Sequence, residues 1–169
     1  MRAHNGRHRH ARKHSMDATT PSKLLAVQHQ HIDQGVAGIV GGNDDTAALA
    51  ASLKLLRQHL HLEETALFPP LEADGLTLPV FVMKREHGQM WPLIARLEAA
   101  CANGATAESL RADCATLLQL LGMHNPKEEQ IVYTAADRYE PAHPGTPLVA
   151  AMAKAKMPEG WRCAMAPRG

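Results

Sequence analysis

The sequence has few aromatic residues, few cysteines and no long apolar run. Six aromatic residues in 169 leave most of the packing to Leu, Ala and Met, which favours helices. The three cysteines, Cys101, Cys114 and Cys163, form no CxxC pair, and an odd number argues against a disulfide framework. No apolar run approaches the roughly 20 residues that span a bilayer. We therefore expect one soluble helical domain in the reducing cytoplasm.

Acidic residues are missing from residues 1–15, which hold five Arg or Lys and four His. The whole chain has 18 basic and 17 acidic residues, so the remainder has 13 and 17, a net charge of −4. A mildly acidic folded part argues against nucleic-acid binding. We expect residues 1–18 to form a disordered tail, because they contain almost no apolar residue that could be buried. We assign no function to this tail.

Four stretches of the chain repeat apolar residues at steps of three and four, the period of an α-helix. Their boundaries are marked by Pro21, Gly41-Gly42, Pro69-Pro70, Pro79, Asn103-Gly104 and Thr106. The apolar positions include Leu25, Ile32, Val36 and Ile39, then Leu49, Leu53, Leu56, Leu60 and Leu67, then Val80, Met83, Met90, Ile94 and Leu97, and finally Leu110, Cys114, Leu117, Leu121 and Ile131. We expect four helices, the second of which ends at Pro69-Pro70.

Short connections make successive helices antiparallel neighbours. The sequence therefore predicts an all-α, up-down-up-down four-helix bundle over residues 19–140. Residues 141–169 carry several prolines and a short apolar segment. We expect them to pack on the bundle as a short C-terminal extension, with Trp161 as an anchor.

One phrase occurs twice in the sequence. HLHLEETALFP begins at His59 and aligns without a gap with HNPKEEQIVYT, which begins at His124. In both, glutamates follow the histidine at i+4 and i+5. The i, i+4 spacing places His59 and Glu63 on one helix face, and likewise His124 and Glu128.

Histidines stand in the apolar stripes where leucine would be expected. They are His29, His59, His87 and His124, one for each predicted helix. In an antiparallel hairpin, facing residues are equidistant from the turn, and the midpoints between successive histidines fall at residues 44, 73 and 105.5, on the three predicted turns. All four should meet at one level of the bundle. His31 and His61 lie off the stripes, and we expect them to face solvent.

Burying four imidazoles with Glu63 and Glu128, and no inward Lys or Arg, costs several kcal/mol per ionised group unless a cation compensates. Six ligands are too many for one tetrahedral zinc and suit two metals bridged by the glutamates. Mixed imidazole and carboxylate donors favour iron ahead of manganese or zinc. The alternative is a pair of buried Glu–His contacts that only specify the helix register.

The motifs resemble those of the hemerythrin-like (HHE) proteins, which are non-haem di-iron four-helix bundles. The resemblance rests on His29, on HLHLE at 59–63, on His87 in REHGQM and on HNPKE at 124–128, and covers residues 20–140. It implies two iron ions cycling between Fe2+ and Fe3+ with a bridging oxo or hydroxo group. The bridging carboxylates would be Glu63 and Glu128, and the four histidines would be terminal ligands.

The chain departs from the oxygen-carrying hemerythrins in its third helix, where Met83 and Trp91 flank His87 in place of a second histidine. The resulting set looks more like that of bacterial di-iron proteins associated with repair of iron–sulfur centres, without their cysteine-bearing N-terminal domain. Glu64, Glu86 or Glu129 are candidates for a seventh ligand. Pro126 removes a helical hydrogen bond, so we expect either a kink at the metal level or a break beside Gly122.

These features predict a di-iron protein that binds or reacts with O2, NO or peroxide and takes electrons from a reductant that the sequence does not identify. An iron- or NO-responsive sensor and an iron-donating stress protein for iron–sulfur repair remain alternatives. The sequence leans against a dedicated enzyme, although Tyr133 or His61 could act as the general acid of a weak peroxidase. We expect no nucleic-acid or membrane partner, and a monomer or dimer.

Overall fold

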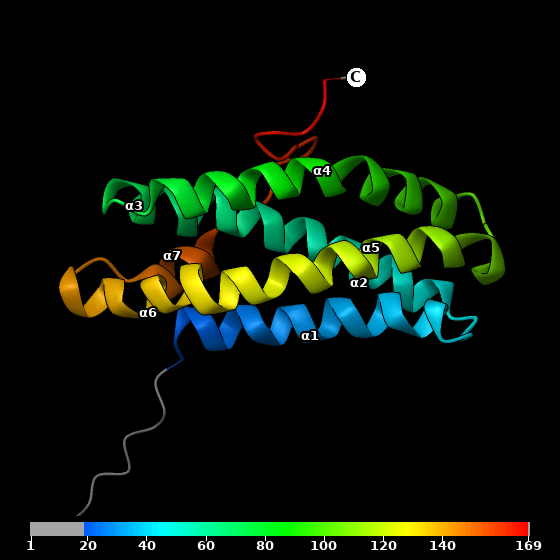
Figure 1. Cartoon of the computed structure of the whole chain (residues 1–169), viewed down its shortest axis with the longest axis horizontal. Coiled ribbons are helices and arrows are strands. Elements are labelled where there is room, and N and C mark those ends of the chain that lie inside the picture. The colour runs from blue at the N-terminus through cyan, green and yellow to red at the C-terminus, as the bar shows by residue number, and fades with distance from the viewer. Residues whose placement is uncertain (1–18, 169) are drawn as a thin grey trace, which may run out of the picture.

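The computed structural model describes residues 19–168 (Figure 1). The predicted tail at 1–18 lies outside the described residues. The elements are α1 (Pro21–Val40), α2 (Thr46–Leu62), the π-helix η1 (Glu63–Leu67), α3 (Phe68–Ala73), α4 (Thr77–Ala102), α5 (Ala107–Lys127), the π-helix η2 (Glu128–Val132), α6 (Tyr133–Ala142) and α7 (Leu148–Lys154). No strand occurs among the described residues, which confirms the all-α prediction.

Several of these elements join end to end. With α1 and α4, the continuous runs α2–η1–α3 and α5–η2–α6 make four long helical segments, one for each predicted helix. They lie side by side with alternating chain direction, and α1 and α4 each pack against α2 and α5 (Figure 1). The short helix α7 is a fifth, which the sequence had indicated only as an apolar segment.

Side-chain caps fix where the segments begin. The Thr20 hydroxyl accepts a hydrogen bond from the Lys23 amide at 3.3 Å, and an Asp45 carboxylate oxygen accepts one from the Ala48 amide at 2.8 Å. Each such cap contributes about 1 kcal/mol. Gly104, at a φ of 75°, lies in the turn that follows α4, where a left-handed conformation favours glycine.

The two π-helices coincide with the repeated phrase. Each begins at the first glutamate of its phrase, and the amides of Phe68 and Tyr133 donate to the carbonyls of Glu63 and Glu128, five residues earlier. A π turn inserts one extra residue and shifts every later side chain around the helix. This is why Ile131, which we expected on the inner stripe, is 47% exposed, whereas Val132 is buried.

Proline has less effect on the helices than the sequence predicted. The prediction that Pro69-Pro70 end the second helix was wrong, because both prolines fall in the first turn of α3, where a missing amide hydrogen costs little. The break beside Gly122 was also wrong, because α5 continues through Pro126 to Lys127.

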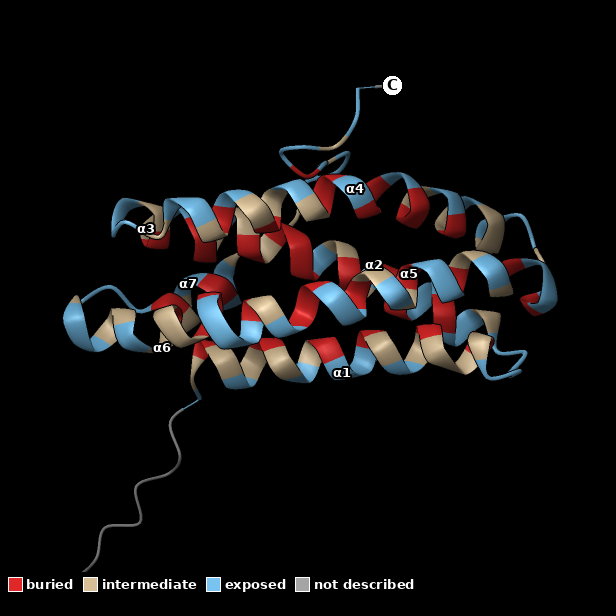
Figure 2. Ribbon diagram, viewed as in Figure 1, coloured by how far each residue is buried: buried red, intermediate tan, exposed pale blue. Residues whose placement is uncertain are grey.

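Two hydrophobic clusters fill the space between the segments, and the buried residues face inward (Figure 2). Going along α1, Leu25 belongs to one cluster and Ile32 to the other, with His29 between them. The same switch occurs in α4, from Met83 to Met90 across His87. A buried polar layer therefore separates the two clusters.

The last residues of the chain cover α4 (Figure 1). The Trp161 ring meets the rings of Trp91 and His61 edge-on, with centroids 5.5 and 5.0 Å apart. His61 is consequently buried at 5% exposure, so the prediction that it faces solvent was wrong, whereas His31 is exposed as predicted. Helical periodicity does not indicate whether a segment distant in the sequence packs over His61. No helix among the described residues is long and apolar enough to cross a membrane.

Candidate metal centre

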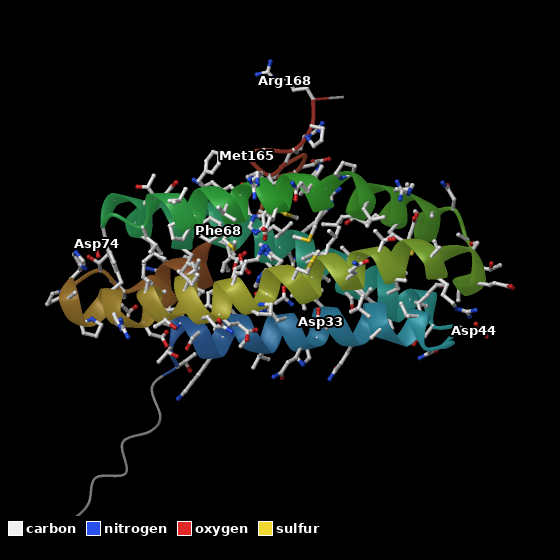
Figure 3. All side chains as sticks on the ribbon, viewed as in Figure 1. Asp33, Asp44, Phe68, Asp74, Met165 and Arg168 are labelled. Atoms are coloured by element: carbon white, nitrogen blue, oxygen red, sulfur yellow. The ribbon has the colours of Figure 1, made fainter. Side chains whose placement is uncertain are left out.

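The structure brings all six predicted ligands into the polar layer. The rings of His29 and His59 lie 4.7 Å apart and those of His87 and His124 lie 5.0 Å apart. Both carboxylates, those of Glu63 and Glu128, start a π-helix and are fully buried. Figure 3 shows Phe68 among the side chains that fill this central space.

The candidate ligand atoms form two groups that share Glu128. The first group is His29, His59, Glu63 and Glu128, and the second is His87, His124 and Glu128, with the atoms of each group within 4.8 Å of one another. Glu63 lies between the groups, because its Oε1 is 3.3 Å from His59 Nε2 and its Oε2 is 3.5 Å from His87 Nε2. Glu128 likewise directs Oε2 to His29, at 3.3 Å, and Oε1 to His124, at 3.0 Å. Each carboxylate therefore offers one oxygen to each group.

A second layer of polar residues orients the imidazoles. The Nδ1 partners are Glu129 for His29 at 2.8 Å, Gln28 for His59 at 2.7 Å, Glu64 for His87 at 2.9 Å and Glu86 for His124 at 2.9 Å. Because each Nδ1 is hydrogen-bonded outward, each Nε2 is turned toward the carboxylates. The three candidates for a seventh ligand are therefore partners of the histidines.

Several atoms of the centre lack a hydrogen bond. Among the described residues, five buried side-chain atoms have no hydrogen-bond partner, and four of them are Glu63 Oε2, His87 Nε2, His124 Nε2 and Glu128 Oε1. These atoms lie 3.0–3.5 Å from one another as imidazole–carboxylate ion pairs, without hydrogen-bond geometry. Once the imidazoles lose their protons, all four atoms can donate an electron pair to a metal, so one bound cation would satisfy them together.

Comparison with known proteins agrees with this geometry. The sequence model of the hemerythrin HHE cation binding domain matches residues 20–136. The chain belongs to this hemerythrin family. No curated protein and no solved structure matches it. The matched residues include all six that meet in the polar layer, so the family's cation-binding character and the buried His/Glu cluster describe the same part of the chain.

The electrostatics of this hemerythrin domain show a need for positive charge. Burial alone would lower the pKa of His124, but Glu128, Glu86 and Glu63 together outweigh this effect and raise the pKa to about 10. The pKa values of His29 and His87 are also raised, against the effect of burial, by their contacts with Glu128. In the metal-free protein, protons on the histidines thus balance the carboxylates, and a metal ion would take their place.

The outer partner of His124 is itself firmly charged. The hydrogen bond from His124, together with an ion pair to Lys127, lowers the pKa of Glu86 to about 2. A charged carboxylate behind an imidazole raises the basicity of the nitrogen on the opposite side of the ring. Glu86 therefore strengthens His124 as an electron-pair donor toward the centre.

Sequence reasoning placed Tyr133 at the rim or as a general acid, but in this hemerythrin domain it is fully buried at the first group. Its hydroxyl donates to Glu63 Oε1 at 2.6 Å. Burial and the two carboxylates raise its pKa well above the ordinary value, so the phenol is neutral in the metal-free protein. The repeat could have indicated this buried position, because Tyr133 aligns with Phe68. The Phe68 ring stacks on His87, with the ring centroids 5.7 Å apart.

Proposed function

We propose that this hemerythrin domain holds two iron ions and that the centre binds or reacts with O2, NO or peroxide. The terminal ligands would be His29, His59, His87 and His124, and the bridging ligands Glu63 and Glu128. The buried donor atoms without a hydrogen bond carry the proposal, because metal ions among them would bind all of them at once and balance the two carboxylates in place of the histidine protons. Zinc and manganese are the second choices for the same donors.

Iron would supply electrons and exchangeable coordination positions at this centre, with an oxo or hydroxo group between the ions. The chain supplies the surroundings. The outer hydrogen bonds hold each imidazole in one orientation, and the two hydrophobic clusters above and below the layer keep bulk water away. The four long segments, arranged as an up-down-up-down bundle, would hold the ligands at fixed positions on rigid helices. We place this function in the cytoplasm, with an external reductant.

The test is reactivity after anaerobic loading with ferrous iron. The wild-type protein should change its visible spectrum on addition of O2, NO or peroxide, because all three ligands bind or oxidise ferrous iron at an open position. His87→Ala should lose most of this response. His31→Ala removes an exposed histidine of α1, two residues from the predicted ligand His29, and is the matched control. An equal response from wild type and His87→Ala would refute the proposed centre.

A sensor function is the second candidate, and one contact favours it. The Ala164 amide donates to Glu64 Oε2 at 2.7 Å, and Glu64 Oε1 accepts from His87 Nδ1 at 2.9 Å. A change at His87 could thus reach the C-terminal segment through one side chain. Hydrogen exchange of the Ala164 amide should then differ between the ferrous and ferric protein, and an unchanged rate would argue against a sensor.

A further inference from the structure

The hydroxyl of Tyr133 lies close to every donor atom of the first group. It is 2.6 Å from Glu63 Oε1, 3.2 Å from Glu128 Oε2, 3.0 Å from His29 Nε2 and 3.3 Å from His59 Nε2. A tyrosine that only supported one ligand from outside would contact that ligand. This one contacts all four.

The four donor atoms are spaced as ligands of one metal are spaced. His29 Nε2 lies 3.1 Å from His59 Nε2 and 3.3 Å from Glu128 Oε2, and His59 Nε2 lies 3.3 Å from Glu63 Oε1. Donors at about 2.1 Å from a metal and at right angles to each other are about 3.0 Å apart. The Tyr133 hydroxyl lies 2.6–3.3 Å from the four atoms, close to the 3.1–3.3 Å between those atoms and their neighbours. It therefore occupies a fifth corner of the same polyhedron.

From this geometry we propose that Tyr133 is a fifth protein ligand of the metal held by the first group, bound as a phenolate. The inference rests on the proposed function, since it requires metal ions at the six residues. On binding, one metal–oxygen bond forms, the phenol O–H bond breaks and the proton leaves to solvent. The charge of the cation balances the phenolate in the buried layer.

The second group has no equivalent of this hydroxyl. The aligned residue there is Phe68, whose ring stacks on His87 and has no donor atom. The four unpaired atoms of the centre, which include both histidine nitrogens of the second group, also lie on this side. The first metal position would consequently have five protein ligands and the second four, which leaves more room for an exogenous ligand at the second. A small ligand such as O2 or NO would bind at the second position, beside Phe68.

The experiment compares Tyr133→Phe with wild type after loading with ferric iron. Wild type should show a tyrosinate-to-iron charge-transfer band, with phenolate ring modes in the resonance Raman spectrum excited in that band. Tyr133→Phe should lose both signatures and keep its iron content. Phenylalanine fits the aligned position in the first half of the repeat, so the variant preserves the ring and its packing. Tyr139→Phe, which changes a partly buried tyrosine stacked on His143, is the matched control and should keep the band.

Iron content separates the two proposals. Wild type with about two irons per chain and no phenolate modes would overturn the assignment of Tyr133 while leaving the di-iron centre intact. Wild type that retains no iron would overturn the proposed function itself, and the Tyr133 assignment with it. If Tyr133→Phe fails to fold, the Raman spectrum of wild type against Tyr139→Phe still decides, because Tyr133 and Tyr139 are the two tyrosines of the chain.

Discussion

Four residues behind the histidines decide which nitrogen each ring presents to the centre. Three of them are carboxylates, Glu64, Glu86 and Glu129, and the fourth is the amide of Gln28. A carboxylate makes the opposite nitrogen more basic than an amide does. We therefore expect the outer residues to affect metal affinity through the histidines that they orient. Sequence reasoning found these carboxylates as candidate ligands but could not tell which layer they belong to, because adjacent glutamates differ only by a rotation around the helix.

Replacing Glu64 tests this outer layer. Glu64→Ala should weaken iron binding about 10- to 100-fold, because His87 loses the partner that orients it. Competition with a chelator under anaerobic conditions measures the affinity. The control is Glu72→Ala. Glu72 lies on the same helical segment as Glu64 but pairs with Lys84, so its loss should leave iron affinity unchanged. Equal affinities for both variants would show that the outer hydrogen bond does not matter.

The raised histidine pKa values give the centre a pH dependence with a defined sign. In the metal-free protein the pKa of His124 is about 10 in the folded state, against the ordinary value of 6.5 that we take for the unfolded state. Its contribution to folding stability is therefore fully present below pH 6.5 and is lost as the pH rises through about 10. A metal ion must displace this proton, so apparent metal affinity should rise with pH at every pH below about 10. Chelator competition at about pH 6 and about pH 8 measures the change. A flat profile would mean that the imidazoles are already neutral.

At the scale of elements, the π-helices explain both the success and the error of the helix pattern. The inward histidines and glutamates lie before or at the start of each π turn, where the ordinary helical period still holds. Ile131 lies after the start of η2, where the extra residue shifts the phase. The gapless repeat did indicate which residue is buried after the shift, since Val132 aligns with Leu67, which is also buried. Hydrophobic spacing alone does not specify whether a backbone amide donates to the carbonyl four or five residues earlier.

Deleting Gln130, an exposed residue within η2, should restore an ordinary α turn. Tyr133 would then follow Glu128 at i+4 and could keep its hydrogen bond to the Glu128 carbonyl as an α turn, so Val132 and Tyr133 should stay in the core. We expect a free energy of unfolding within about 1 kcal/mol of wild type, because the two large buried side chains keep their contacts. Chemical denaturation measures it, with Gln130→Ala as the control of near wild-type stability. A loss of several kcal/mol on deletion would show that the π turn does more than accommodate one extra residue.

At the scale of the whole molecule, the C-terminal segment makes contacts with the bundle that the four long helices do not make among themselves. It buries His61 under Trp161 and reaches Glu64 through the Ala164 amide. The short apolar segment and Trp161 predicted that residues 141–169 would pack on the bundle, but they could not indicate which face these residues cover. That choice depends on Gly88, where a Cβ atom would lie 2.2 Å from the Met165 carbonyl oxygen.

Gly88→Ala should therefore displace the C-terminal segment. We expect a loss of roughly 1–3 kcal/mol in the free energy of unfolding and faster hydrogen exchange at the Ala164 amide, because the two backbones can no longer approach. Gly122→Ala, in an open position of α5, is the matched control and should be neutral or stabilise by up to about 1 kcal/mol. Equal behaviour of the two variants would mean that the segment is not seated on α4.

The central claim is that six buried residues hold two metal ions, and metal content per chain tests it most directly. The protein is purified with iron present, both as the natural sequence and with the four histidines of residues 1–15 replaced by alanine, so that the tail cannot account for bound metal. We predict about two irons per chain in both, with a visible band that anaerobic reduction bleaches. Protein that retains no metal, or a single zinc, would contradict the account, and the buried glutamates and histidines would then serve only the packing of the helices.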